Sequence, residues 1–127
     1  MAESSLITER IGNVALVSFR DASMLDAVTI QKIARELYAI VEDESNTNVV
    51  LDFTHVRFLS SQALGVLLTV RRKADRKATK VVLCKIRPEL ARVFKVTNLD
   101  KMFEFHDSTE QALAGFRQAS ASDDSSS

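Results

Sequence analysis

The chain has 127 residues, the length of a single domain, and a chain of this size can bury roughly two-thirds of its unfolded surface without staples. Apolar residues make up 46% and charged residues 27%, with only 3 Gly and 1 Pro, which excludes collagen-like, disulfide-stapled and wholly disordered chains. Lys plus Arg and Asp plus Glu number 17 each, so no net charge favours nucleic acid.

The single cysteine and the chain ends indicate the compartment. Cys84 has no second cysteine to form a disulfide, and the first ten residues lack the apolar stretch of a signal peptide. No apolar run reaches the roughly 18 residues that span a bilayer. We therefore expect a cytoplasmic protein without membrane insertion, with one domain at 1–117 and a disordered Ser/Asp-rich tail at 118–127.

Strand-like and helix-like patterns alternate along the chain. Apolar residues alternate in the strands and recur every three or four positions in the helices. Ser108 followed by Gln111 is typical of a capping box at a helix start. The predicted elements, in chain order, are strands at 6–9 and 13–19 joined by a turn at Gly12, a helix from Thr29, a strand at 48–53, a helix at 61–77, a strand at 80–84, a helix at 88–96, a strand at 102–106 and a helix after Ser108.

This alternation predicts the α/β class. Strands that alternate with helices form a mostly parallel sheet through right-handed crossovers, and the turn at Gly12 makes the first strand antiparallel to its neighbour. About four helices should flank the sheet. In the helix at 61–77 we expect one side to carry Leu64, Leu67, Leu68 and Arg71.

Two adjacent serines, Ser60 and Ser61, stand where the second predicted helix begins. A serine at a helix start has a structural task, because its hydroxyl accepts a hydrogen bond from an otherwise unpaired backbone N–H. This task alone accounts for either serine. The surrounding residues carry more information: Phe58-Leu59-Ser60-Ser61-Gln62-Ala63-Leu64-Gly65-Val66.

That segment resembles the phosphorylation-site region of anti-sigma factor antagonists, the bacterial half of the STAS family (sulphate transporter and anti-sigma factor antagonist). In this register Ser61 falls on the phosphorylated serine, Ser60 replaces a common Asp, and Gln62 replaces a second hydroxyl residue. Upstream, the segment from Leu25 and Asp26 to Thr29 also resembles the family pattern. The resemblance covers about residues 5–117 and implies the STAS fold.

The resemblance also implies a function and its partners. An unphosphorylated antagonist binds an anti-sigma factor, typically a serine kinase, and so releases a sigma factor for transcription. The kinase phosphorylates the antagonist, here at Ser61, and a phosphatase resets it. The implied partner-binding residues are Asp26, Ser60, Ser61 and Gln62. Phosphorylation adds roughly −1.5 to −2 charges, so it switches binding without any catalytic group in this chain.

Other side chains support weaker interpretations. Asp26 fits a partner-binding residue and a cap of the first helix equally well. Asp52, at the end of its strand, either holds a loop or is a solvated carboxylate. With two histidines and one cysteine, no spacing predicts a metal site, and no motif pairs His55 with Ser61 as a catalytic base, so we expect neither cofactor nor enzyme activity. The alternatives are a STAS scaffold in a signalling or lipid-transport assembly without phosphorylation and, less favoured, a small hydrolase or nucleotide-binding enzyme.

The charges are unevenly distributed. Residues 71–101 carry 11 basic and 3 acidic residues, whereas both flanking segments are acidic. Such a run is most often a solvated helix face, and the functional alternative is an acidic protein partner. Direct nucleic-acid binding is disfavoured, because no aromatic residues are interleaved with the basic ones.

Overall fold

The computed structural model describes residues 6–20, 23–24 and 27–116. The predicted tail at 118–127 and Asp26 lie outside these residues. The elements are β1 Leu6–Ile11, β2 Val14–Phe19, β3 Ser23–Met24, α1 Ala27–Glu42, β4 Asn48–Asp52, β5 Phe58–Leu59, α2 Ser61–Arg76, β6 Lys80–Cys84, α3 Pro88–Val96, the 3-10 turn η1 Leu99–Lys101, β7 Glu104–His106 and a further helix over 109–116.

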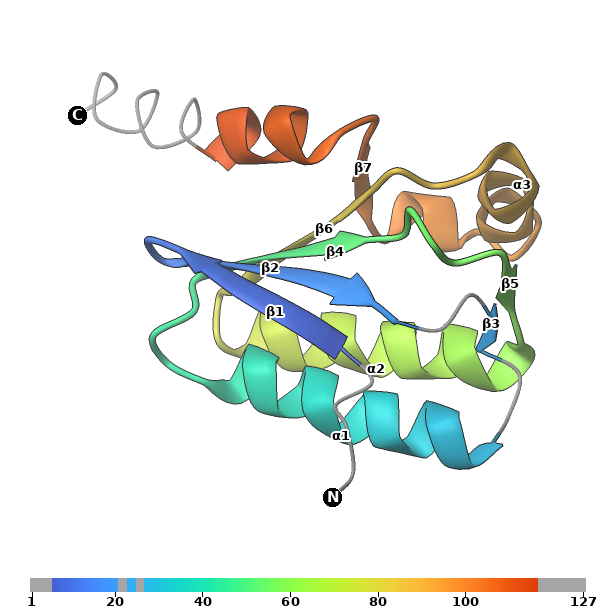
Figure 1. Ribbon diagram of the computed structural model, residues 1–127, viewed down its shortest axis with the longest axis horizontal. Coiled ribbons are helices and arrows are strands. Elements are labelled where there is room, and N and C mark those ends of the chain that lie inside the picture. The colour runs from blue at the N-terminus through green and yellow to red at the C-terminus, as the bar shows by residue number, and fades with distance from the viewer. Residues whose placement is uncertain (1–5, 21–22, 25–26, 117–127) are drawn as a thin grey trace.

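A five-stranded sheet in the order β1-β2-β4-β6-β7 forms the centre of the molecule (Figure 1). β1 pairs antiparallel with β2, and every other pairing in this sheet is parallel, which confirms the predicted class and the direction of the first strand. Gly12 joins β1 to β2 with φ +62°, a backbone conformation that glycine adopts without strain. Parallel strands need long crossover connections, and the helices between β2, β4, β6 and β7 supply them.

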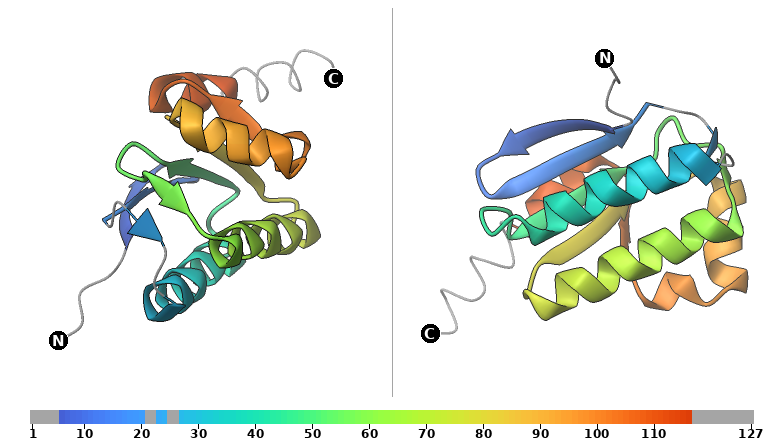
Figure 2. Two further views of the ribbon diagram at one scale, coloured as in Figure 1. Left: turned by 90° about the vertical axis from the view of Figure 1, so that its right-hand side faces the viewer. Right: turned by 90° about the horizontal axis from the view of Figure 1, so that it is seen from below.

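The sheet is buried on both faces. One face packs against α1 and α2, where Val17, Leu51 and Leu37 belong to a large buried cluster. On the other face a smaller cluster joins Val50 of the sheet to Phe116 of the 109–116 helix. The figures show α1 and α2 on one side of the sheet and the last helix on the opposite side (Figures 1 and 2). Within the described residues no helix combines the length and the apolar character needed to cross a membrane.

The structure corrects two details of the prediction. The buried side of α2 is formed by Ala63, Leu67, Val70 and Ala74, whereas Leu64 and Leu68 are only half-buried, so the predicted stripe was rotated around the helix. The last strand is shorter than expected, because residues 99–101 form a 3-10 turn before it.

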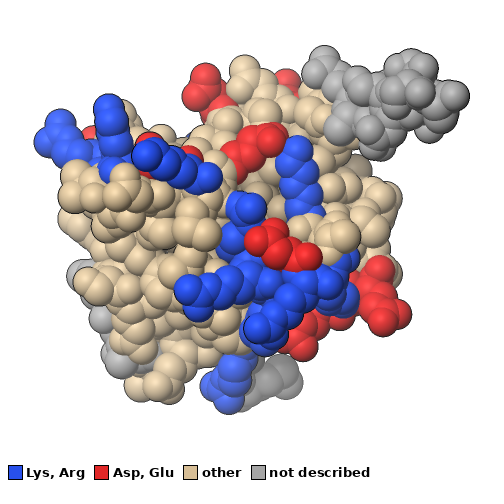
Figure 3. All heavy atoms as spheres, turned by 180° about the vertical axis from the view of Figure 1, so that it is seen from behind, with Lys and Arg blue, Asp and Glu red and all other residues tan. Residues whose placement is uncertain are grey.

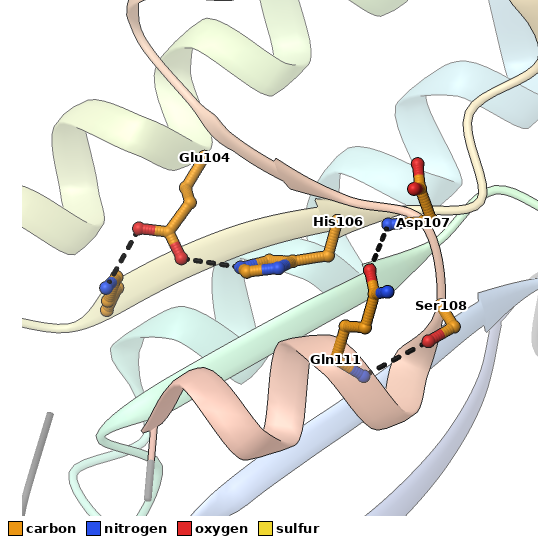
Figure 4. A network of polar contacts seen from close by, with 6 residues as sticks. Glu104, His106, Asp107, Ser108 and Gln111 are labelled. Atoms are coloured by element: carbon orange, nitrogen blue, oxygen red, sulfur yellow. Dashed lines mark hydrogen bonds and ion pairs between the residues drawn. The ribbon is translucent and has the colours of Figure 1, made fainter. Parts of the chain in front are cut away.

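The start of the final helix carries the predicted serine cap. The backbone N–H of Gln111 donates to Ser108 Oγ at 3.1 Å (Figure 4). The side-chain oxygen of Gln111 accepts from the N–H of Asp107 at 3.1 Å, one residue before the position that a capping box predicts.

Beside this cap, Glu104 lies 2.6 Å from His106 Nε2, and this contact holds the pKa of the Glu104 carboxyl below its usual value.

Candidate functional site

The amino-terminal end of α2 is built on Ser60. With φ −80° and ψ 166°, Ser60 has the extended backbone of an N-cap, and its Oγ accepts from the N–H of Ala63 at 3.1 Å. Its carbonyl accepts from the N–H of Leu64 at 3.0 Å, the first bond of the helix. Ser60 is half-buried, and the capping task that the sequence assigned to either serine therefore belongs to Ser60.

Ser61 is the first residue of α2, and it is exposed. In the described part of the chain no residue, His55 included, hydrogen-bonds its hydroxyl. The next residue, Gln62, is also exposed, which leaves the two side by side on the surface of the first helical turn. A helix amino terminus presents unpaired N–H groups and a partial positive charge, so this position tolerates a phosphate.

The loop from β4 to Ser60 is held by internal hydrogen bonds and buried side chains. Asp52 Oδ1 accepts from the backbone N–H of Thr54 at 2.9 Å and from the Thr54 hydroxyl, so Asp52 holds the loop. The loop's own Phe53 and Val56 are fully buried, and the N–H of Phe53 donates to the carbonyl of Cys84 at 3.0 Å. The loop thereby anchors the helix start to the sheet.

Two short strands, which the sequence did not predict, bring the upstream segment to this loop. Ser23 pairs with Phe58 and Met24 with Leu59 in a parallel two-stranded sheet. The chain just before Asp26 is therefore a neighbour of the chain just before Ser60. The views agree that β3, β5 and the starts of α1 and α2 lie at one end of the molecule (Figures 1 and 2). The start of α1, where the upstream segment that resembles the STAS family ends, and the start of α2 both lie there, and the role of Asp26 itself stays a prediction.

Phe58 is a surface residue that sequence reasoning did not assign to the site. Its side chain is 58% exposed, although it is large and apolar. The apolar pair Phe58-Leu59 is typical of a buried stretch, so the sequence held no signal for exposure of Phe58. Phe58 also lines an open groove with residues of α3.

We expect Ser60→Ala to lower the free energy of unfolding by about 1 kcal/mol, within the 0.5–2 kcal/mol range of N-cap losses. The reason is that the N–H of Ala63 loses its acceptor, whereas Ser60→Asp supplies a new one. Urea denaturation of both variants measures the difference. Ser61→Ala is the matched control, and a larger loss from Ser61→Ala than from Ser60→Ala would show that the cap is assigned to the wrong serine.

The remaining candidate side chains are those of His55, His106 and Cys84. Among the described residues no group of three His, Cys, Asp or Glu could hold a metal ion. His55 is exposed and His106 contacts Glu104. Cys84 is buried in β6, and burial, with a contribution from Asp52, raises the pKa of its thiol to about 12.

The raised pKa of Cys84 predicts an unreactive thiol. Because the thiolate is the nucleophile, a pKa of about 12 keeps Cys84 protonated and inert at neutral pH. We expect no reaction of the native protein with an aromatic disulfide reagent at pH 8, and one equivalent after unfolding in guanidinium chloride. Rapid labelling of the native protein would contradict the burial of this side chain.

The first part of the basic segment, residues 71–80, forms a surface at the far, carboxyl end of α2, whereas its later residues belong to α3 and the chain on either side of it (Figure 3). Several of its cations are paired: Arg71 with Asp75 at 2.9 Å, Lys73 with Glu42 at 3.2 Å, and Lys80 with Glu104 at 3.0 Å. These contacts fit the solvated face that the sequence favours, since exposed ion pairs of this kind contribute little binding energy.

Comparison with known proteins identifies the family. The STAS domain matches residues 5–112. The anti-sigma factor antagonist BtrV of Bordetella bronchiseptica is 29% identical over 96 residues, which cover 76% of this chain and 82% of that protein. An anti-sigma factor antagonist from Mycobacterium paratuberculosis, 28% identical, superimposes with a TM-score of 0.77 over 88% of this chain and 92% of that chain. The phosphorylated form of the Bacillus cell fate determinant SpoIIAA, 17% identical, shares the fold with a TM-score of 0.68 over 87% of this chain and 98% of that chain. Because the family match spans most of the chain and the sheet has the expected order, the chain belongs to the STAS domain family.

Proposed function

We propose that the protein is an anti-sigma factor antagonist that is switched off by phosphorylation of Ser61. In its unmodified form it binds an anti-sigma factor in the cytoplasm through the amino-terminal end of α2, and it thereby frees a sigma factor for transcription. Asp26, Ser60, Ser61 and Gln62 belong to the binding surface. The chain needs no contact with nucleic acid or membrane and no catalytic group of its own.

One observation carries this proposal: the exposed hydroxyl of Ser61 stands on the first turn of α2, while Ser60 caps the helix. Modification of Ser61 therefore breaks no hydrogen bond of its hydroxyl to the part of the chain that the structure describes. A phosphate there gains from the partial positive charge of the helix end, so the fold survives. An interface packed against the small hydroxyl does not survive the added bulk and charge.

The relatives support the choice of partner. Two of the similar proteins are named anti-sigma factor antagonists, and a fold neighbour exists in a phosphorylated form. The partner proposed here is accordingly an anti-sigma factor that is itself a serine kinase, with bound ATP as phosphate donor. A separate phosphatase removes the phosphate and restores binding.

The test begins with the native complex. The tagged full chain is used to capture its partner from a lysate of the organism that encodes the chain. The captured complex is incubated with ATP, and the masses of the intact proteins are then measured. We expect an anti-sigma factor with kinase activity, one added phosphoryl group on this chain, and dissociation. A stable partner that never transfers phosphate would contradict the phosphorylation switch and favour a scaffold. Hydrolysis of ATP or of an ester by the isolated chain would indicate an enzyme.

A further inference from the structure

An open groove of about 440 Å³ lies between the loop at β5 and helix α3. Its apolar walls include Phe58 on one side and Leu90 and Val93 on the other. Phe58 is largely exposed and Val93 is half-buried, so both offer apolar surface to a partner. Within the described residues nothing covers this groove.

The groove carries more positive than negative charge. Arg57 and Arg87 line it together with one acid, Glu89. Farther along α3, Arg92 and Lys95 are exposed as well. The rim therefore favours an acidic partner, because complementary charge selects and orients the molecule that docks.

Arg87 has hydrogen-bonding capacity that the described part of the chain does not use. One terminal nitrogen of its guanidinium donates to the carbonyl of Thr54 at 3.5 Å. Its Nε–H is buried and has no acceptor. A guanidinium binds a carboxylate through two parallel N–H groups. Arg87 lines the groove and is only half-buried, so its guanidinium is placed to meet a carboxylate there, although the buried Nε–H itself does not face the groove opening.

We propose that this groove binds an acidic, apolar segment of the anti-sigma factor, with an apolar side chain against Phe58 and Val93 and carboxylates at Arg57 and Arg87. The inference rests on the proposed function, because a lining residue of the groove, Phe58, lies close to Ser61 along the chain. Phe58 precedes Ser61 by three residues, a length of chain that spans at most about 11 Å. A partner that covers Ser61 therefore reaches the groove.

The same proximity couples the groove to the switch. The Debye length is about 8 Å at physiological salt and about 30 Å at 0.01 M, so charges up to ~11 Å apart are strongly screened at physiological salt and interact effectively at low salt. A phosphate on Ser61 repels the carboxylates of a segment seated beside it. Phosphorylation thus weakens the complex through charge as well as through bulk, and the effect of a charged variant at Ser61 is larger at low salt.

The basic surface at the far end of α2 is the competing site for an acidic partner. Several of its cations already pair with acids of this chain. Its first cation, Arg71, follows Ser61 by ten residues of α2, a length of about 15 Å along the helix. The groove has neither disadvantage, and we therefore place the acidic segment there.

The experiment measures binding of the purified anti-sigma factor recovered with the full chain, using calorimetry at two salt concentrations. We expect Phe58→Ala and Arg57→Glu to weaken binding by about tenfold or more, as for central interface residues. Arg87→Lys keeps the charge but loses the planar fork, and we expect it to weaken binding about threefold or more. Arg72→Glu on the basic surface is the matched control for charge reversal and should stay within about twofold.

The possible results separate the two proposals. If Ser61→Asp weakens binding but the groove variants bind like the unaltered chain, the groove proposal fails and the proposed function stands. If neither set changes binding, both fail. If Arg72→Glu weakens binding as much as the groove variants do, the acidic segment binds at the basic surface and the inference is overturned. It is also overturned if the isolated chain self-associates and Phe58→Ala abolishes this, because the groove then binds a second copy. Circular dichroism confirms that the variants, all at surface or half-buried positions, remain folded.

Discussion

Ser61→Asp is expected to weaken binding of the anti-sigma factor by about tenfold or more, which corresponds to about 1.4 kcal/mol or more. The substitution places a negative charge on an exposed position that the proposed interface covers. Aspartate has less charge and bulk than a phosphate, so the phosphorylated chain should bind more weakly still. Ser61→Ala leaves a small neutral surface and should bind within about twofold of the unaltered chain.

Calorimetric titration of the two variants with the purified anti-sigma factor measures this difference. Ser60→Asp is the charge control: it keeps an acceptor for the N–H of Ala63 and moves the same charge to a half-buried position. We expect it to weaken binding less than Ser61→Asp. A loss with Ser60→Asp alone would show that the register of the motif is wrong by one residue, and no loss with either would favour a scaffold.

Ser61→Ala has a second expected property that the sequence alone did not predict. A serine at a helix start is expected to contribute capping energy, and the sequence left this task to either serine. The structure gives it to Ser60, so Ser61→Ala should be nearly neutral for stability. Helix boundaries are uncertain by one or two residues in any sequence pattern, and here a single residue decides which hydroxyl is bonded and which is free.

The long periodic elements could be predicted, because many apolar residues contribute to each pattern. The two-residue strands β3 and β5 could not, since two residues carry no period. The orientation of α2 was predicted wrongly for a related reason. Its buried side includes Ala63 and Ala74, and small side chains allow close packing but contribute little to a hydrophobic pattern dominated by leucines.

The candidate site divides in the same way. Ser61 and Gln62 could be proposed because the motif is continuous in the sequence; the structure places both on the surface, and their roles stay predictions. The groove could not be found, because Phe58 and Val93 belong to elements that are far apart in the chain and meet only in the fold. The exposure of Phe58 follows from the course of the loop, which local sequence does not specify.

Phe53→Ala is expected to cause the largest loss of stability. Phe53 is fully buried where β4 ends, with its ring 5.1 Å from that of Phe19 and 6.4 Å from that of Phe94. Truncation of a buried phenylalanine costs about 3–5 kcal/mol, a large share of the 5–15 kcal/mol that stabilises a typical domain. For a chain of this size the melting temperature should fall by roughly 10–20 °C.

Phe58→Ala is the matched control, because it makes the same substitution on the other end of the same loop, at a side chain that is 58% exposed. Its effect on the free energy of unfolding should stay within about 0.5 kcal/mol, as for most surface positions. Thermal and urea unfolding measure both variants.

The binding experiments should show the reverse order: at a temperature where both are folded, Phe58→Ala weakens binding of the anti-sigma factor, whereas Phe53→Ala lowers only the fraction of folded molecules. Equal losses of stability would contradict the placement of the two rings, because the contrast depends entirely on one being buried between Phe19 and Phe94 and the other lining the open groove.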